Sequence, residues 1–159
     1  MKHILIILFL LTGTAGFAQN NKSSIDTLKY CLRPDRAGVG GYDVVCYFHS
    51  DRPLLGKKDF AAKYDGVEYL FASDANRKKF IKNPSQYLPQ FGGWCSMTLV
   101  MGRATTPTYD NFAILSGKLY LFERTLSVNG RELWLMDTKG NEKTATENYT
   151  VYRTTGRIK

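Results

Sequence analysis

The clearest pattern of apolar and polar positions along the chain is a pair of strand-like segments around a tight turn. Residues 60–64 and 67–71 are rich in aromatic and aliphatic side chains, and they flank Asp65-Gly66. This dipeptide tolerates the positive φ angles that a two-residue hairpin turn requires. The pattern therefore predicts a β-hairpin.

Two further turn dipeptides predict additional hairpins. Residues 111–115 and 118–122 lie around Ser116-Gly117, and residues 127–128 and 133–136 lie around Asn129-Gly130. The run from Tyr42 to Phe48 has the β-branched and aromatic content of a buried strand.

Helix signals lie between the first two hairpins. Ser73 can cap a helix that runs to Asn83-Pro84, and Asp74 places negative charge in its first turn. A short helix is predicted from Pro84 to Leu88, because proline suits a first helical turn. A third helix is predicted from Trp94 to Met101, with Gly102 ending it.

These elements predict an α+β fold, a small antiparallel sheet of β-hairpins packed against two or three short helices, in one monomeric domain. We find no internal repeat in the sequence. Aromatic side chains contribute large apolar areas, so six of them are expected to form one core. They are Phe60, Tyr69, Phe71, Phe80, Tyr87 and Trp94.

The first 18 residues have the three regions of a signal peptide. Lys2 is followed by an apolar run over residues 4–11, and Gly16 and Ala18 suit a cleavage site. A spanning helix needs about 18 apolar residues, so no membrane span is expected. We predict export to the periplasm or the medium.

The remaining chain divides by polarity. Residues 19–36 are predicted to be a flexible lead-in, residues 37–136 the folded domain with C-terminal strands, and residues 137–159 a loosely ordered tail with one edge strand at residues 149–153.

Charge and histidine content exclude several function classes. The formal net charge is +8, but Lys and Arg are scattered and export separates the chain from nucleic acid, so no nucleic-acid partner is expected. The two histidines are His3, in the leader, and His49, which excludes zinc sites built from two or three imidazoles. No nucleophile elbow, oxyanion-hole motif or carboxylate pair accompanies His49, which argues against an enzyme.

Sulfur is the candidate chemistry. Cys95, Met97 and Met101 lie close in sequence, and in a helix the two methionines share one face. Thiolate and thioether ligands favour Cu(I) and similar soft ions, and Cys46 could join them. Alternatively, these side chains fill the core, or two of Cys31, Cys46 and Cys95 form a disulfide, with three pairings open.

Several of these segments together resemble the YHS domain family. The resemblance rests on Asp43-Val44-Val45-Cys46, on the hairpin from Tyr64 to Ser73, and on Asn83-Pro84-Ser85-Gln86-Tyr87. The segment from Gly41 through Phe91-Gly92-Gly93-Trp94-Cys95 is similar to an exported, single-domain branch of that family. The resemblance covers residues 39–122.

The resemblance implies a small α+β unit with a suspected role in binding heavy metals, since YHS domains occur beside metal-transporting ATPases and in oxygenase components. Related metal-site domains carry cysteines at the end of the second hairpin strand and four residues on. Those positions are Ala72 and Asn76 here, so only Cys46 of that set is present. Two functions therefore stay open: a soft-metal binding or sensing module, and a structural or interaction domain with an envelope protein as partner.

Overall fold

The computed structural model describes residues 26–32 and 37–158 of the chain. The first half contains the 3₁₀ turns η1 (Gly38–Gly41) and η2 (Cys46–Phe48), strands β1 (Lys57–Tyr64) and β2 (Val67–Phe71), and helices α1 (Asp74–Lys82) and α2 (Pro84–Tyr87). The second half contains η3 (Gln90–Gly93), α3 (Ser96–Val100), β3 (Thr108–Leu115), β4 (Lys118–Phe122), α4 (Gly130–Met136) and α5 (Thr138–Thr155).

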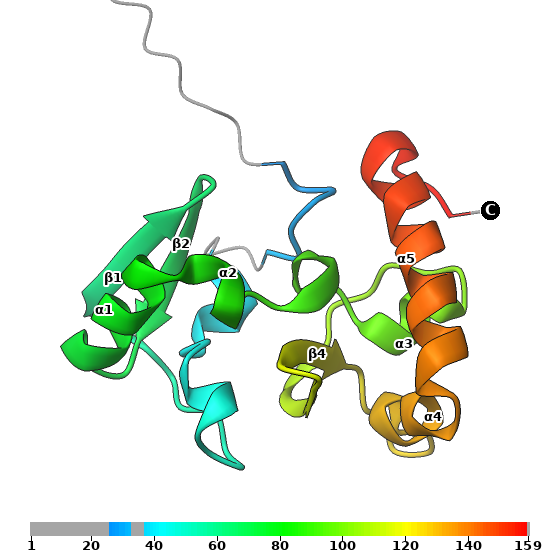
Figure 1. The fold of residues 1–159 in the computed structure, drawn as a ribbon. Coiled ribbons are helices and arrows are strands. Elements are labelled where there is room, and N and C mark those ends of the chain that lie inside the picture. The colour runs from blue at the N-terminus through cyan, green and yellow to red at the C-terminus, as the bar shows by residue number, and fades with distance from the viewer. Residues whose placement is uncertain (1–25, 33–36, 159) are drawn as a thin grey trace, which may run out of the picture.

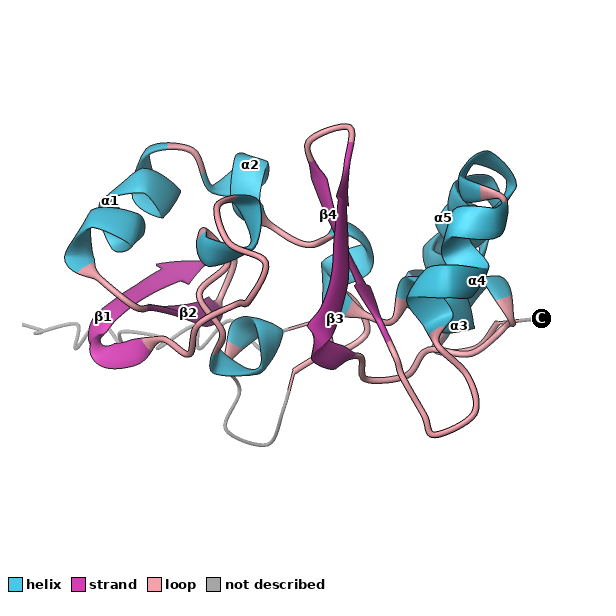
Figure 2. Cartoon of the chain, turned by 90° about the horizontal axis from the view of Figure 1, so that it is seen from below, coloured by secondary structure: helices cyan, strands magenta, loops and turns pink. Residues whose placement is uncertain are grey.

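The two halves lie side by side, each built on its own hairpin. In Figure 1 the β1–β2 hairpin and helix α1 lie on one side, and helices α3, α4 and α5 lie on the other. Figure 2 shows the β3–β4 hairpin between these two groups. The described residues form two antiparallel two-stranded sheets. The predicted α+β class is confirmed, although two separate sheets replace the single one expected.

The two hairpins predicted at Asp65-Gly66 and Ser116-Gly117 are present. Both turns use positive φ angles, 48° at Asp65 and 49° at Ser116, each followed by a glycine. Positive φ angles at both turn residues are the geometry that these two dipeptides predict.

Helices α1 and α2 are also confirmed. The Ser73 side chain accepts a hydrogen bond from the backbone N–H of Asn76 and caps α1. Pro84 begins α2, where its missing N–H costs no helical hydrogen bond. Helix α3 begins at Ser96, two residues later than predicted, because Cys95 takes the capping position.

The strand predicted over residues 42–48 is wrong. Glycines with positive φ precede this segment, and the Asp43 carboxylate accepts a hydrogen bond from the N–H of Val45 at 2.9 Å. The backbone of Asp43 also accepts one from Cys46 at 3.1 Å. These local bonds satisfy the backbone within turns, so the apolar residues are buried without joining a sheet.

The third hairpin, around Asn129-Gly130, is also wrong. Asn129 caps helix α4, and its side chain accepts a hydrogen bond from the N–H of Arg131. Trp134, on this helix, is fully buried. Asparagine followed by glycine suits both a hairpin turn and a helix start, and burial of Trp134 favours the helix.

The loosely ordered tail and its edge strand are contradicted by helix α5. The Asp137 side chain caps the helix by accepting a hydrogen bond from the N–H of Gly140, and Gly156 ends it in the left-handed conformation. Ala145 is buried against the rest of the protein. The helix was missed because its exposed face is rich in Thr, Asn and charged residues, so its apolar stripe is narrow.

Residues 26–32 pack onto the fold, in contrast to the expected flexible lead-in. Tyr30 and Cys31 are buried, and the backbone N–H of Cys31 donates to the carbonyl of Gly92 at 3.0 Å. The predicted signal peptide, residues 1–18, lies outside the described residues.

The apolar interior forms two clusters and not one. Tyr69, Phe71, Phe80 and Tyr87 lie in the cluster of the first half, with Phe60 packed against it. The predicted sixth member, Trp94, packs against the second cluster, which surrounds Trp134. The β3–β4 hairpin separates the two clusters, because its opposite faces are buried on different sides: Leu119 and Leu121 belong to the first cluster, and Tyr120 and Phe122 belong to the second.

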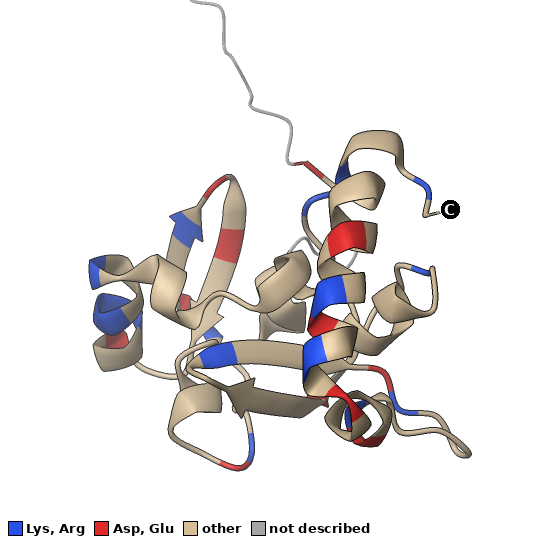
Figure 3. Cartoon of the chain, turned by 45° about the vertical axis from the view of Figure 1, so that its right-hand side comes forward, with Lys and Arg blue, Asp and Glu red and all other residues tan. Residues whose placement is uncertain are grey.

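The surface carries mixed charge. Lys and Arg occur in both halves with Asp and Glu among them (Figure 3). Among the described residues, no helix combines the length and the apolar character needed to span a membrane.

Candidate functional site

A cavity of about 210 Å³ lies between helix α3, the segment that follows β4, and helix α4. Three of the four predicted sulfur ligands line it: Cys95, Met97 and Met101. The other lining residues are Thr98, Arg103, Glu123, Thr125, Val128, Gly130 and Leu133.

Cys95 lies at the start of helix α3 and is fully buried. Its Sγ accepts two backbone hydrogen bonds, from the N–H of Thr98 at 3.4 Å and from the N–H of Glu123 at 3.1 Å. Its own N–H donates to the carbonyl of Thr105 at 3.0 Å. The sulfur is therefore held by its own helix and by Glu123, and the Cys95 backbone is held by Thr105.

The two methionines contribute from the same helix at different depths. Met97 packs against the second core cluster, whereas Met101 is 46% exposed at the end of α3. The Arg103 guanidinium lies close to the Met101 thioether, with Nη2 3.8 Å from Sδ. Met101 therefore belongs to the part of the cavity nearest to solvent.

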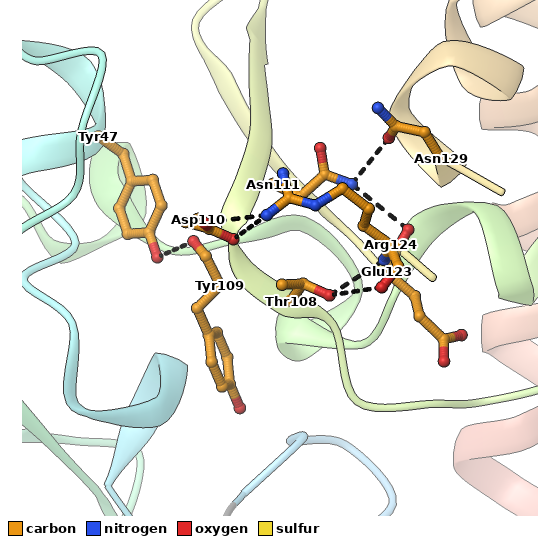
Figure 4. Close-up of polar contacts among 8 residues, drawn as sticks. All are labelled: Tyr47, Thr108, Tyr109, Asp110, Asn111, Glu123, Arg124 and Asn129. Carbon is orange, nitrogen blue, oxygen red and sulfur yellow. Dashed lines mark hydrogen bonds and ion pairs between the residues drawn. The ribbon is translucent and has the colours of Figure 1, made fainter. Parts of the chain in front are cut away.

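The segment that follows β4, residues 123–129, is called the roof loop here. Asn111 holds it by donating to the carbonyl of Glu123 at 3.3 Å and to Oδ1 of Asn129 at 2.9 Å (Figure 4). Nη2 of Arg124 donates to both carboxylate oxygens of Asp110, at 3.1 and 3.0 Å. These contacts fix one wall of the cavity against strand β3.

The cavity contains one side chain of each charge. Arg103 and Glu123 both line it, and Oε2 of Glu123 accepts a hydrogen bond from the Thr105 hydroxyl at 3.1 Å. Their opposite charges offset each other. The thiol of Cys95 and the thioethers of Met97 and Met101 are therefore the main candidate ligand atoms of the cavity.

The fourth predicted ligand, Cys46, lies in the first half of the molecule. Its Sγ is 3.4 Å from Nδ2 of Asn76, and it does not line the cavity of Cys95. Burial, together with the nearby Asp43 carboxylate, raises the pKa of the Cys46 thiol to about 11. Cys46 therefore lies apart from the other three predicted sulfur ligands.

The disulfide alternative is not realised in this structure. Cys31, Cys46 and Cys95 are all buried free thiols. Cys31 lies beside Thr106, with its Sγ 3.7 Å from the hydroxyl oxygen, and burial raises the pKa of its thiol.

No conventional metal cluster accompanies the cavity. Within residues 26–32 and 37–158, no three His, Cys, Asp or Glu side chains lie close enough together to hold a metal ion. His49 lines a wide groove between the halves, and Asp51 and Asp110 also line it. A metal site in the described part of the chain would therefore depend on the methionine thioethers.

Residues 47–91 match the model of the YHS domain. This segment is a YHS domain. It contains the last two residues of η2, the β1–β2 hairpin, α1 and α2. It begins directly after Cys46 and ends before Cys95. No curated protein and no solved structure matches the chain.

The cavity of Cys95 thus lies outside the matched YHS segment. The sequence singled out its sulfur residues but missed Arg103 and Glu123, which come from segments with no motif of their own. Glu123 was missed because its role depends on strand β4 ending next to helix α3.

Proposed function

We propose that this YHS-domain protein binds a soft metal ion, Cu(I), in the cavity lined by Cys95, Met97 and Met101. The observation that carries the proposal is that these three sulfur side chains line one cavity. Thiolate and thioether sulfur are the ligands that Cu(I) prefers.

The surroundings of Cys95 support a ligand role. Loss of the thiol proton on metal binding leaves a sulfur that already accepts hydrogen bonds from Thr98 and Glu123. Such bonds to a ligand atom orient it and tune its basicity.

The size of the cavity and its charges also fit a small cation. About 210 Å³ accommodates an ion and one further small ligand, since a water molecule takes about 30 Å³ in the liquid. Glu123 supplies negative charge, and Met101 is the sulfur closest to solvent.

Export is the second part of the proposal. The basic start, the apolar run and the small residues before position 19 support removal of residues 1–18. The intact mass of protein recovered from the envelope or the medium tests this directly. A mass that includes residues 1–18 would exclude it.

The alternative function is a non-catalytic interaction domain. It is favoured by large apolar side chains that are exposed on the roof loop and on helix α4. Leu126 is fully exposed and Met136 is 78% exposed. Such side chains mark protein contacts when they lie together on a surface.

Anaerobic titration of the reduced protein against a coloured Cu(I) chelator tests the metal proposal. We expect one Cu(I) per chain, tenfold or greater loss of affinity in Cys95→Ala, and a smaller loss in Met101→Leu. Zn(II) should bind far more weakly, since the site has no imidazole.

Two variants serve as controls in this titration. Met136→Leu changes a methionine that does not line the cavity, and Cys46→Ala removes a thiol of the other half. Both should bind like the wild type. Equal binding by wild type and Cys95→Ala, or no binding by either, would rule out the metal site and favour the interaction domain.

A further inference from the structure

The two hairpins of this protein have the same register. Strand β1 has 8 residues and β2 has 5, and β3 and β4 have the same lengths. Each residue pair in the first hairpin has a counterpart 51 positions later in the second. The pair Lys57↔Phe71 corresponds to Thr108↔Phe122, and the pair at the first turn, Tyr64↔Val67, corresponds to Leu115↔Lys118. Even the irregularity after the first pair falls at the same place.

The turns that precede the hairpins are also alike. Val39 and Phe91 adopt left-handed φ angles of 53° and 54°, and the glycines that follow them have φ of 59° and 61°. A residue other than glycine with positive φ is uncommon, and both Val39 and Phe91 are bulky, so the recurrence of this conformation at an equivalent place is informative. Each turn is preceded by a parallel bridge to the second strand of its hairpin, Ala37↔Glu68 and Pro89↔Leu119.

The residue two places after each pair of glycines, Asp43 or Cys95, accepts a hydrogen bond from the backbone directly after the second strand of its hairpin. Oδ2 of Asp43 accepts a hydrogen bond at 2.8 Å from the N–H of Ala72, the first residue after β2. Sγ of Cys95 accepts one at 3.1 Å from the N–H of Glu123, the first residue after β4. Both side chains are fully buried, and each also accepts a hydrogen bond from an N–H that follows it in the chain, that of Val45 for Asp43 and that of Thr98, in α3, for Cys95.

The sequence carries a short trace of the same relationship. Tyr69-Leu70-Phe71 ends the first hairpin and Tyr120-Leu121-Phe122 ends the second, again 51 positions apart. The turn glycines Gly66 and Gly117 have the same spacing.

We infer that the chain contains one structural unit twice, as residues 37–82 and 89–136, and that Cys95 is the buried anchor of the second copy at the position that Asp43 occupies in the first. The second copy lies almost entirely outside the matched YHS segment. The anchor joins the end of the hairpin to the turn that precedes it.

The duplication also accounts for the cavity. In the first copy α1 begins at Asp74, and the Asn76 amide donates to Asp43 at 2.8 Å and covers the anchor. In the second copy the roof loop lies between β4 and helix α4, which begins only at Gly130. In the part of the chain that the structure describes, no side chain equivalent to Asn76 covers Cys95 there, and the cavity lies next to it. If the proposed function holds, the bound ion occupies the place of the Asn76 amide, in direct contact with Cys95.

Exchange of the two anchors tests the inference without metal. Cys95→Asp combined with Glu123→Ala reproduces the Asp43–Ala72 pair in the second copy and removes a nearby carboxylate. Its matched control is Cys95→Ala with Glu123→Ala. The reciprocal pair is Asp43→Cys against Asp43→Ala.

Urea unfolding of the metal-free proteins is the readout. We expect each exchange variant to unfold at a higher urea concentration than its alanine control, because only the exchange retains an acceptor for the buried N–H. A midpoint equal to or below that of the alanine control would overturn the equivalence. If an alanine control does not fold, folding of its exchange variant supports the equivalence. An exchange variant that does not fold overturns it. Loss of Cu(I) binding does not affect this result, so the two proposals fail separately.

Discussion

The Sγ of Cys95 lies 3.1 Å from the backbone nitrogen of Glu123 and accepts its hydrogen bond. Glu123 follows strand β4 and Cys95 precedes helix α3, so this contact joins two elements 28 residues apart. The buried sulfur of Cys95 therefore holds the end of strand β4 against the start of helix α3, and it also lines the cavity proposed to bind metal.

The structural task of Cys95 predicts a loss of stability in Cys95→Ala. The change leaves the N–H groups of Thr98 and Glu123 without their acceptor in a buried setting, which costs about 1–3 kcal/mol. Cys95→Ser should recover part of this loss, because a hydroxyl oxygen also accepts hydrogen bonds. Denaturant unfolding of the metal-free proteins measures both, and wild-type stability in Cys95→Ala would contradict the prediction.

Arg103 is predicted to weaken metal binding. Its guanidinium lies against the Met101 thioether and brings positive charge to the cavity. Arg103→Ala should therefore raise the Cu(I) affinity several-fold, whereas Arg131→Ala, on α4 but outside the cavity, should leave it unchanged. Competition titration against the same chelator provides the comparison, and weaker binding in Arg103→Ala would show that the arginine supports the site.

Two glycines with left-handed φ should differ in their tolerance of alanine. Gly92 has φ of +61°, and a Cβ there would collide with the backbone carbonyl of Lys29. Gly117 has φ of +74° with open space around it. Gly117→Ala should cost only the conformational strain, about 1–2 kcal/mol, whereas Gly92→Ala adds overpacking of about 1–3 kcal/mol or more. Similar losses in urea unfolding would mean that residues 26–32 do not pack as the structure shows.

The attachment of helix α5 should depend on pH. Oε1 of Glu142 accepts hydrogen bonds from Lys118 at 2.8 Å and from Tyr120 at 2.7 Å, and these lower the pKa of the Glu142 carboxyl. The resulting stabilisation is present above its ordinary value of 4.5 and is lost as the pH falls through the lowered pKa.

Glu142→Gln should remove this dependence. The side chain is partly exposed, so the effect at neutral pH should stay below about 1 kcal/mol. Unfolding curves between neutral pH and pH 3 measure it, with Glu147→Gln on the same helix as control. An unchanged slope in Glu142→Gln would show that the ion pair does not contribute.

Local signals allowed the sequence to predict both confirmed hairpins and the cap of α1. The dipeptides Asp65-Gly66 and Ser116-Gly117 predict their turns because they tolerate positive φ angles. Ser73 predicts a helix cap because its hydroxyl oxygen can accept a hydrogen bond from a backbone N–H in the first turn of the helix. Asn129-Gly130 was misread because the same residues suit a hairpin turn and a helix start. Only the burial of Trp134, a tertiary effect, favours the helix there.

The candidate site was only partly predictable. Met97 and Met101 lie one helical turn apart, so their common face was visible in the sequence. The position of Cys46 away from this cavity was not visible in the sequence, because it depends on how the two halves of the molecule fold. The sequence alone showed no internal repeat, because the only trace of the proposed duplication is short: the repeated Tyr-Leu-Phe at residues 69–71 and 120–122 and the equally spaced turn glycines.

X-ray absorption spectroscopy of the Cu(I)-loaded protein tests the central claim most directly, because it reports the atoms bound to the metal. The account predicts a first shell of sulfur atoms in the wild type, with fewer sulfur neighbours in Met101→Leu and no loaded protein in Cys95→Ala. A first shell dominated by nitrogen or oxygen, or one that does not change when Cys95 is replaced, would contradict the account.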